Sequence, residues 1–454
     1  MKLYNVLTLC VPLVLMPLTV YSSDVFDELD AEVESYAHPD ADKIKAEYTK
    51  FIADYLNEYD QWRKGYLTDF DNAQSKIIKK WGDDDTANKQ RNVEYSKDLT
   101  SKAVIDYQNN EAVVEVLVDS TVSTEEAQKI LADKIARLVK DKGANIAELS
   151  SSIKEINPEN ITVETIEYSD HNEKKAKDVI IQQTVSYMQE ADKRADKLLT
   201  ENSRLSPEII ENAVAEKKKE LQKEEQGRLA VVAENYQSLR QHGDAQLSEN
   251  SDSIKPETQK KVKYKVKLPK NSLAKRAEKY TDFAERESKE FGVPAALIMA
   301  IMHSESAFDP NAKSPVPAYG LMQIVPRTAG HDVNKLVRNI DKPMQAKELY
   351  VPDVNVQTGS AYLSILDKRY LKSIKNPQSR LYCTIAAYNT GAGNVAKVFN
   401  KKGQGNTRNI KRAAQVINQL SPQEVYDALM AKLPYDETKH YLQKVSSRIP
   451  LYEI

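Results

Sequence analysis

Glu305 is the residue whose surroundings most suggest chemistry. It lies at the end of an almost wholly apolar run, Ala295-Ala-Leu-Ile-Met-Ala-Ile-Met-His-Ser-Glu305. A helix that is apolar all round is buried, and a glutamate is almost never buried without a partner or a function. Burial favours the neutral acid, and the negative end of a helix dipole acts in the same direction. The sequence therefore predicts that Glu305 is held protonated near neutral pH and donates a proton to a leaving group.

Two later stretches offer polar groups that such an acid would need. Proline and glycine shape the segment 311–320, and the packed run Leu321-Met-Gln-Ile324 follows it. The segment 386–393, Ala-Ala-Tyr-Asn-Thr-Gly-Ala-Gly, places an aromatic hydroxyl and an amide before a glycine turn. Taken singly, each has an equally good structural explanation: Glu305 as a paired acid, Gln323 as a loop-fastening amide and Tyr388 as a core ring.

In this order, the stretches resemble the catalytic domain of the soluble lytic transglycosylases, which has a lysozyme-like fold. Five ordered blocks carry the resemblance: Glu305-Ser-x-Phe-Asp-Pro310, Gly320-Leu-Met-Gln-Ile324, Pro352-Asp-x-Asn-x-x-x-Gly359-x-x-Tyr-Leu363, Ala387-Tyr-Asn-x-Gly-x-Gly393 and Glu437-Thr-x-x-Tyr441. Five blocks are far more specific than one short motif. The arrangement of the chain is similar to the membrane-bound lytic murein transglycosylase C family, in which a signal sequence and an α+β domain precede this domain.

The resemblance implies cleavage of the β-1,4 bond between N-acetylmuramic acid and N-acetylglucosamine without water. Glu305 would protonate the glycosidic oxygen and then, as a carboxylate, deprotonate the muramyl 6-hydroxyl, which closes a 1,6-anhydro ring. An ordinary glycosidase needs two carboxylates beside the bond, but here the substrate's N-acetyl group stabilises the cation. Tyr388 is expected to hydrogen-bond or position Glu305. The family pattern assigns substrate contacts in the sugar site to Ser314, Met322, Gln323, Tyr388, Asn389 and Tyr441.

Other residues near these blocks are interpreted as structural. Asp309 is the nearest second carboxylate, and its Asp-Pro context favours a turn over a nucleophile. His303 lies on another face of the helix from Glu305, and Cys383 is predicted to be a buried hydrophobe rather than a reactive thiol. Pro317 stands where related enzymes often have glycine, which is expected to reshape a sugar subsite. No Cys, His and acidic residues have metal-ligand spacing, so no metal or cofactor is expected.

Two other functions stay open. One is a lysozyme-like muramidase that hydrolyses the same bond. The other is a non-catalytic cell-wall binding protein, against which the intact Glu305 block argues. The expected partners are peptidoglycan glycan strands, with other cell-wall proteins contacted through the N-terminal domain.

The fold class expected for the whole chain is α+β. A mostly helical, lysozyme-like catalytic domain at 271–454 follows an α+β N-terminal domain at 24–268. The latter is expected to hold a helix at 41–80 that ends at Gly82, a helix opened by the capping box Ser123-Thr-Glu-Glu126, and strands at 102–107, 112–118, 161–166 and 261–267. Asn109-Asn110 predicts a tight hairpin between the first two strands, and 261–267 is expected to return to their sheet.

A helical insertion at about 173–249 has no counterpart in the family. Its Glu, Lys, Gln and Ala content predicts long solvent-washed helices or a helical hairpin, with a new helix at Ser206-Pro207-Glu208. A partner-binding coiled coil is the alternative. Lysines 261, 263, 265 and 267 share one strand face, which is interpreted as a guard on an edge strand. A surface for an anionic polymer is the alternative.

Composition and the N-terminus bound the setting. The 454 residues are 41% hydrophobic and 29% charged with a net charge of −2, which predicts two or three domains and gives no basic field for nucleic acid. Lys2, the apolar residues 3–20 and Tyr21-Ser-Ser23 predict a signal peptide at 1–23 and a periplasmic enzyme, with a retained anchor as the alternative. Cys10 lies inside the apolar core, so no lipid-attachment cysteine is expected, although outer-membrane association stays open.

Overall fold

The computed structural model describes residues 41–142, 157–201, 205–245, 259–401 and 407–453. Residues from Ile52 onward pack as one unit, separate from the residues before them. The predicted signal peptide and Cys10 lie outside the described residues. In the ranges that are described, no helix is long and apolar enough to cross a membrane.

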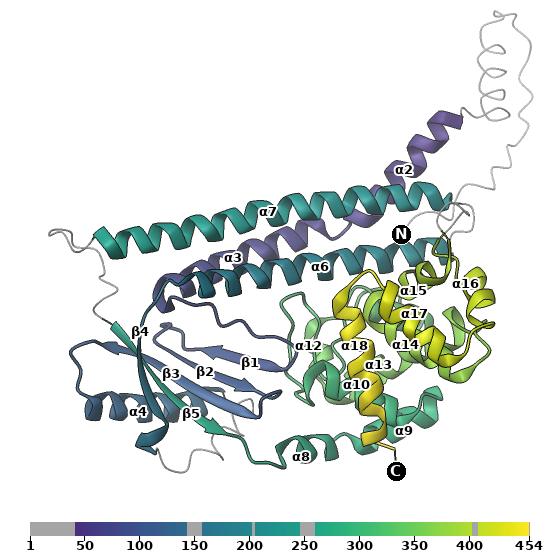
Figure 1. The fold of residues 1–454 in the computed structure, drawn as a ribbon. Coiled ribbons are helices and arrows are strands. Elements are labelled where there is room, and N and C mark those ends of the chain that lie inside the picture. The colour runs from purple at the N-terminus through teal and green to yellow at the C-terminus, as the bar shows by residue number, and fades with distance from the viewer. Residues whose placement is uncertain (1–40, 143–156, 202–204, 246–258, 402–406, 454) are drawn as a thin grey trace, which may run out of the picture. The chain divides into compact units, whose positions relative to one another are not determined.

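A five-stranded antiparallel sheet forms the first part of this unit (Figure 1). Its order is β1-β2-β3-β5-β4, with bounds β1 Arg91–Tyr95, β2 Ser101–Asp106, β3 Glu111–Asp119, β4 Ile161–Thr165 and β5 Gln259–Lys267. The predicted hairpin is confirmed, because Asn110 has a φ of 54° between β2 and β3. The return of 261–267 to the sheet is also confirmed. β1 escaped prediction because its five residues are all half-buried and show no alternation.

Helix α4, Thr124–Lys142, covers one face of this sheet. Its Ala127 and Leu131 are buried against Val114 and Val116 of β3. The backbone N–H of Glu126 donates to the Ser123 hydroxyl at 3.2 Å, so the predicted N-terminus of this helix is confirmed.

The interpretation of the β5 lysines as an edge guard is wrong, because β5 lies between β3 and β4. Lys261 is buried and contacts Asp83 at 3.0 Å, and Lys263 contacts Glu164 at 2.6 Å. The buried ammonium of Lys102 on β2 also lies 3.2 Å from Asp83. The ion pairs of Lys261 and Lys102 with Asp83 fix the acidic turn after Gly82 to the sheet.

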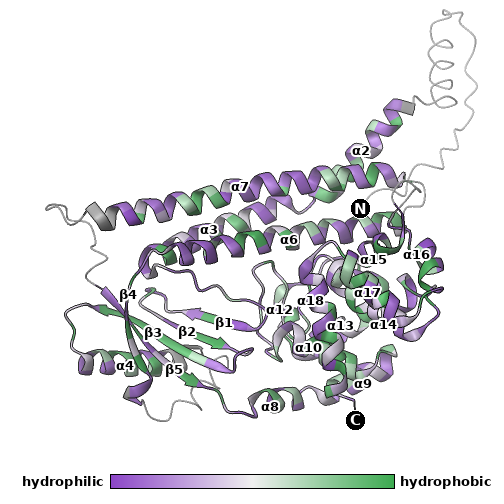
Figure 2. Cartoon of the chain, viewed as in Figure 1, coloured by the Kyte–Doolittle hydropathy of each residue, from purple (hydrophilic) through white to green (hydrophobic). Residues whose placement is uncertain are grey.

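Three long helices lie side by side beyond the sheet (Figure 1): α3 Asp60–Trp81, α6 Asp170–Glu201 and α7 Pro207–Ala245. The helix predicted at 41–80 is two helices, α2 Ala41–Asn57 and α3, and Gly82 ends α3 with a φ of 74° as predicted. The helical hairpin of α6 and α7 is confirmed. Figure 2 shows mostly hydrophilic residues on both helices, with hydrophobic residues interspersed among them. The description as solvent-washed was incomplete, because α6 also packs on α14 and α15.

The C-terminal part is helical and shares one hydrophobic core, so the expected α+β class is confirmed. Its helices are α8 Ser272–Glu278, α9 Thr281–Phe291, α10 Ala295–Ser306, α11 Ala329–Leu336, α12 Ala346–Leu349, α13 Pro352–Ile365, α14 Pro377–Thr390, α15 Ala392–Phe399, α16 Ile410–Ile417, α17 Pro422–Lys432 and α18 Asp436–Arg448. Helix α10 is buried along all but its first two residues. It contacts α9, α13 and α18, which places its end deep inside the unit.

Candidate active site

Helix α10 delivers Glu305 in its last turn. Left-handed backbone at Ala307 (φ 49°) and Phe308 (φ 66°) ends the helix directly afterwards. Glu305 is only 3% exposed, as the apolar run predicts. Behind it, the Ser306 hydroxyl lies 2.8 Å from the Leu321 carbonyl oxygen and 3.1 Å from that of Met302. Glu305 is therefore presented by a rigid element.

A cavity of about 740 Å³ opens over Glu305. That volume lies within the range of about 300–1,000 Å³ typical of ligand sites. Most of the residues predicted from sequence line it: Glu305, Ser314, Gln323, Tyr388 and Asn389. Met322 and Tyr441 do not reach its surface.

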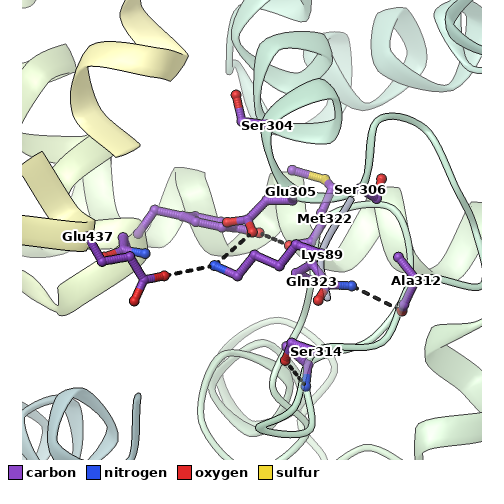
Figure 3. A network of polar contacts seen from close by, with 12 residues as sticks. Lys89, Ser304, Glu305, Ser306, Ala312, Ser314, Met322, Gln323 and Glu437 are labelled. Atoms are coloured by element: carbon purple, nitrogen blue, oxygen red, sulfur yellow. Dashed lines mark hydrogen bonds and ion pairs between the residues drawn. The ribbon is translucent and has the colours of Figure 1, made fainter. Parts of the chain in front are cut away.

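Gln323 presents a buried acceptor at the cavity. Its Nε2 donates to the carbonyl oxygens of Ala312 at 3.0 Å and Gly320 at 2.9 Å (Figure 3). Among the residues described, its Oε1 has no hydrogen-bond partner. Buried polar atoms are rarely left unpaired. Gln323 thus fastens the loop with one end of its amide and offers the other end to an N–H or O–H donor.

Tyr388 was expected to hydrogen-bond or position Glu305, but its hydroxyl hydrogen-bonds to a backbone carbonyl oxygen. Its hydroxyl donates to the Met322 carbonyl oxygen at 2.8 Å. Burial, followed by the nearby Glu305 charge, raises the pKa of Tyr388 well above its usual value. Met322 is a wall residue behind the cavity, whose sulfur packs so closely on Gly359 that a Cβ there would clash. Together they brace the loop that carries Gln323.

The remaining predicted residues lie in or beside the cavity wall. Tyr441 is buried beside Glu305, and burial followed by that carboxylate raises the pKa of its phenol well above the ordinary value. Asn389 Oδ1 accepts from the Thr438 hydroxyl at 2.6 Å. The Ser314 hydroxyl donates to the Val316 carbonyl oxygen and accepts from the Ala318 N–H at 3.3 Å, so it shapes the proline-rich turn.

Glu305 has a partner that the sequence did not reveal. The Lys89 ammonium lies 3.3 Å from Glu305 Oε2 and 3.2 Å from Glu437 Oε1 on α18 (Figure 3). Burial of Lys89 opposes its charge, but the two carboxylates raise the pKa of its ammonium. The cavity therefore holds an acid–ammonium–acid cluster rather than an isolated acid.

The comparison with protein families identifies this part of the chain. Residues 282–411, which include Glu305 and most of the residues that line its side of the cavity, match the family described as the transglycosylase SLT domain. The chain carries an SLT domain. The predicted resemblance to lytic transglycosylases is thus confirmed for this region.

Relatives of the SLT domain are named accordingly. Membrane-bound lytic murein transglycosylase C of Serratia proteamaculans (strain 568) is 43% identical over 182 residues, which cover 40% of this chain and 49% of the relative. The same-named protein of Edwardsiella ictaluri (strain 93-146) is 44% identical over 183 residues, which cover 40% and 48%. The chain spans about half the length of the curated relatives it matches. The 70 kDa soluble lytic transglycosylase of Escherichia coli is 28% identical over 38% of this chain and 24% of its own, with a TM-score of 0.29.

Helix α6 forms the wall of the cavity opposite the SLT domain. The α6 residues that line it include four polar residues at helical spacing, Gln182, Ser186, Gln189 and Lys193, together with Ile181, Gln183, Val185 and Glu190. Lys193 Nζ donates to the Tyr388 carbonyl oxygen at 3.3 Å. The Gly393 N–H donates to Asp196 at 2.7 Å. The glycine turn after Asn389 therefore packs against α6 and does not face open solvent. The helical insertion therefore limits the cavity.

Asp309, His303 and Cys383, which were interpreted as structural, do not line the cavity. The Asp309 carboxylate accepts from the Asn311 N–H at 2.9 Å, as in a turn, and does not line the cavity. Burial, then the charges of Arg448, Lys444 and Arg276, lower the pKa of His303 to about 3. Cys383 is wholly buried, which raises the pKa of its thiol to about 12.

Asn355 of α13 supports the Gln323 loop and gives a stability prediction. Its buried amide accepts from the Met322 N–H at 2.8 Å and donates to the carbonyl oxygens of Tyr319 and Leu349 at 2.7 Å. Asn355→Ala leaves these groups unpaired. Each such group costs about 1–3 kcal/mol. We expect the free energy of unfolding to fall by about 3 kcal/mol or more, measured by urea denaturation.

Asn418 provides a matched control, because its amide also joins a backbone N–H (Lys375, 2.7 Å) to a carbonyl oxygen (Ser373, 2.9 Å) but is exposed. Asn418→Ala should cost less than about 1 kcal/mol. Equal losses in the two variants would contradict the bracing role of Asn355.

Proposed function

We propose that this chain is a lytic transglycosylase that cleaves the β-1,4 bond between N-acetylmuramic acid and N-acetylglucosamine in peptidoglycan, forming 1,6-anhydromuramic acid. The observation that carries the proposal is the position of Glu305, buried at the end of α10 under a cavity of saccharide size within an SLT domain. The names of the relatives, which are lytic murein transglycosylases, support the same substrate.

In the proposed reaction, one carboxyl group acts twice. Protonated Glu305 gives its proton to the glycosidic oxygen as the bond from that oxygen to C1 breaks. The substrate's N-acetyl group stabilises the cationic C1. The Glu305 carboxylate then takes the proton of the muramyl 6-hydroxyl, whose oxygen bonds to C1. Glu305 returns to its protonated form and no water is consumed.

The neighbouring groups suit this chemistry. The free Oε1 of Gln323 can accept a hydrogen bond from an acetamido N–H or a sugar hydroxyl. Asn389 and Ser314 lie on the same cavity surface, and we assign both to substrate contact. We assign Met322, Tyr388 and Tyr441 to the support of that surface.

A second candidate is a muramidase that hydrolyses the same bond, and Glu437 favours it. A hydrolase uses a second carboxylate as nucleophile or to activate water. Glu437 contacts the same ammonium as Glu305, and chiefly the charge of Lys89 lowers the pKa of Glu437, so it is ionised. Its side chain is 42% exposed, however, whereas Glu305 is buried.

Product analysis in ¹⁸O-labelled water separates the two candidates. Purified sacculi digested by the wild-type protein should release muropeptides with 1,6-anhydro ends that carry no ¹⁸O, as measured by mass spectrometry. Hydrolysis would instead give reducing ends heavier by one labelled water. A hydrolytic lysozyme in the same water provides the control, and labelled reducing ends from both enzymes would exclude the lytic reaction.

We further propose that the protein acts in the periplasm, where its substrate lies. The predicted signal peptide at 1–23 and the membrane-bound relatives support this location. The domain boundaries at 24–268 and 271–454, and contacts with other cell-wall proteins through the first of these domains, stay predictions.

A further inference from the structure

The segment before β1 brings a cation to the proposed acid. Lys89 lies 216 residues before Glu305 in the chain, yet its ammonium contacts Glu305 at 3.3 Å and Glu437 at 3.2 Å. The same ammonium lies 6.0 Å from the centre of the Tyr441 ring. The SLT domain therefore does not supply all the charges of its own cavity.

Hydrogen bonds of the residue next to Lys89 fix this part of the backbone to α10 and α18. Gln90 Nε2 donates to the carbonyl oxygens of His303 at 3.0 Å and Ser304 at 3.2 Å. These carbonyls belong to the last turn of α10, where a helix leaves acceptors unpaired. Lys444 of α18 donates to Gln90 Oε1 at 2.7 Å. Gln90 thus caps α10, whose last turn carries Glu305.

Ion pairs also fix the residues on either side of Lys89 to the sheet. Arg91 contacts Asp85 at 2.7 Å, and the buried Lys102 lies beside Asp83 and Asp85. Lys89 therefore lies between two residues held by side-chain contacts, Asp85 before it and Gln90 after it, unlike a lysine on a free surface loop.

Such an ammonium affects the two proposed steps in opposite ways. An opposite charge within about 4–6 Å favours the ionised form of a carboxyl group. It therefore opposes the proton donation that opens the reaction and suits the carboxylate that ends it. Glu437 offers the ammonium another partner whenever Glu305 is protonated.

We propose that Lys89 is a positioning residue that pairs with the Glu305 carboxyl group in the free enzyme, and that Glu437 retains the Lys89 ammonium when Glu305 donates or takes up its proton. This inference rests on the proposed function of Glu305. The remaining charged and titratable groups that face this cluster are Glu190 and Lys193 of α6, Tyr388 of α14, and Asp436, His440, Tyr441 and Lys444 of α18.

These surrounding groups do not replace Lys89. Burial is the main cause that lowers the pKa of Lys193, with Glu190 acting against it. Burial and then Arg448 lower the pKa of Lys444 to about 8, so its charge weakens at alkaline pH. Lys89 is the ammonium for which the structure gives a direct contact with Glu305.

The test is the pH profile of kcat/KM, which reports groups of the free enzyme, on a soluble peptidoglycan glycan fragment. A reaction that needs protonated Glu305 loses rate as pH rises. Lys89→Met removes the positive charge, so its alkaline limb should move up by about one pH unit or more. Glu437→Gln leaves the ammonium to Glu305 alone and removes a negative neighbour, so its limb should move down. Lys89→Arg should keep the wild-type limb.

Lys174→Met is the control, because this α6 lysine is 77% exposed and pairs with its helix neighbour Asp178. Its profile should match the wild type. An unmoved limb in Lys89→Met, a shift of the same sign in Glu437→Gln, or a folded Lys89→Met variant inactive at every pH would overturn the inference. If wild-type protein makes anhydro products while the limbs stay fixed, this inference fails and the proposed function stands. If it makes none, the proposed function itself fails.

Discussion

Glu305→Gln is expected to reduce glycan cleavage by about 10²- to 10⁴-fold, the usual contribution of a positioned acid or base. At 1.36 kcal/mol per tenfold, this is about 3–5 kcal/mol of transition-state stabilisation. The amide keeps the shape of the side chain and an oxygen that can face Lys89, but it neither donates the proton nor accepts it back. Release of soluble muropeptides from purified sacculi, at the pH optimum of each variant, measures the loss.

Glu437→Gln is the matched control, since it changes the other carboxylate on the same ammonium. At its own pH optimum it should keep at least about a tenth of the wild-type rate, well above the loss expected for a positioned acid. Far-UV circular dichroism of both variants checks that the fold is retained. If Glu305→Gln still lyses sacculi, or if the two variants lose equal activity, Glu305 is not the acid and base proposed here.

Local sequence patterns predicted the elements well. The apolar run before Glu305 predicted a buried helix, because such a run has no face that suits water. Alternation predicted β5, and Asn109-Asn110 predicted the hairpin before β3. The position of β5 within the sheet was not predictable, since the short β4, which is mostly exposed, decides whether β5 is an edge.

The candidate site was predictable only in part. Five ordered blocks located the residues around Glu305. The Tyr388 hydroxyl, however, donates to the Met322 carbonyl oxygen, and no local pattern encodes a contact across 66 residues. Lys89 gave no signal, because it lies in a short polar segment and meets Glu305 only after the whole unit has folded. Helix α6 did carry a signal, since four of its polar cavity residues, Gln182, Ser186, Gln189 and Lys193, recur at i+3 and i+4. A polar stripe is usually solvated, which is why it was interpreted as a solvent face.

Arg408→Met is expected to lower the free energy of unfolding by about 3 kcal/mol, because it removes the buried cation that pairs with Asp192 and leaves that carboxylate with the partly exposed Lys218. Arg408 and Asp192 are almost wholly buried and form an ion pair, and Arg408 also contacts Asp196 at 2.8 Å. Burial opposes the charge of Asp192, but Arg408 and Lys218 lower the pKa of that carboxyl. Stability from a lowered pKa is present above the unfolded value of about 3.9 and is lost as pH falls. Urea denaturation should therefore show the largest loss near pH 7 and a smaller one below about pH 4.

The same variant tests whether α6 belongs to the active cavity, because Asp192 adjoins Lys193 on the wall opposite Glu305. Lys219→Met is the control: it breaks an ion pair with Glu216 in which both side chains are more than half exposed, and such pairs contribute about 0–1 kcal/mol. Asp192→Asn combined with Arg408→Met should recover part of the stability, since removing both charges leaves neither one buried alone. If Arg408→Met unfolds like the Lys219→Met control, α6 is not fixed to the SLT domain by this pair. If Arg408→Met is destabilised as expected but cleaves glycans at the wild-type rate, α6 stabilises the fold without shaping the cavity.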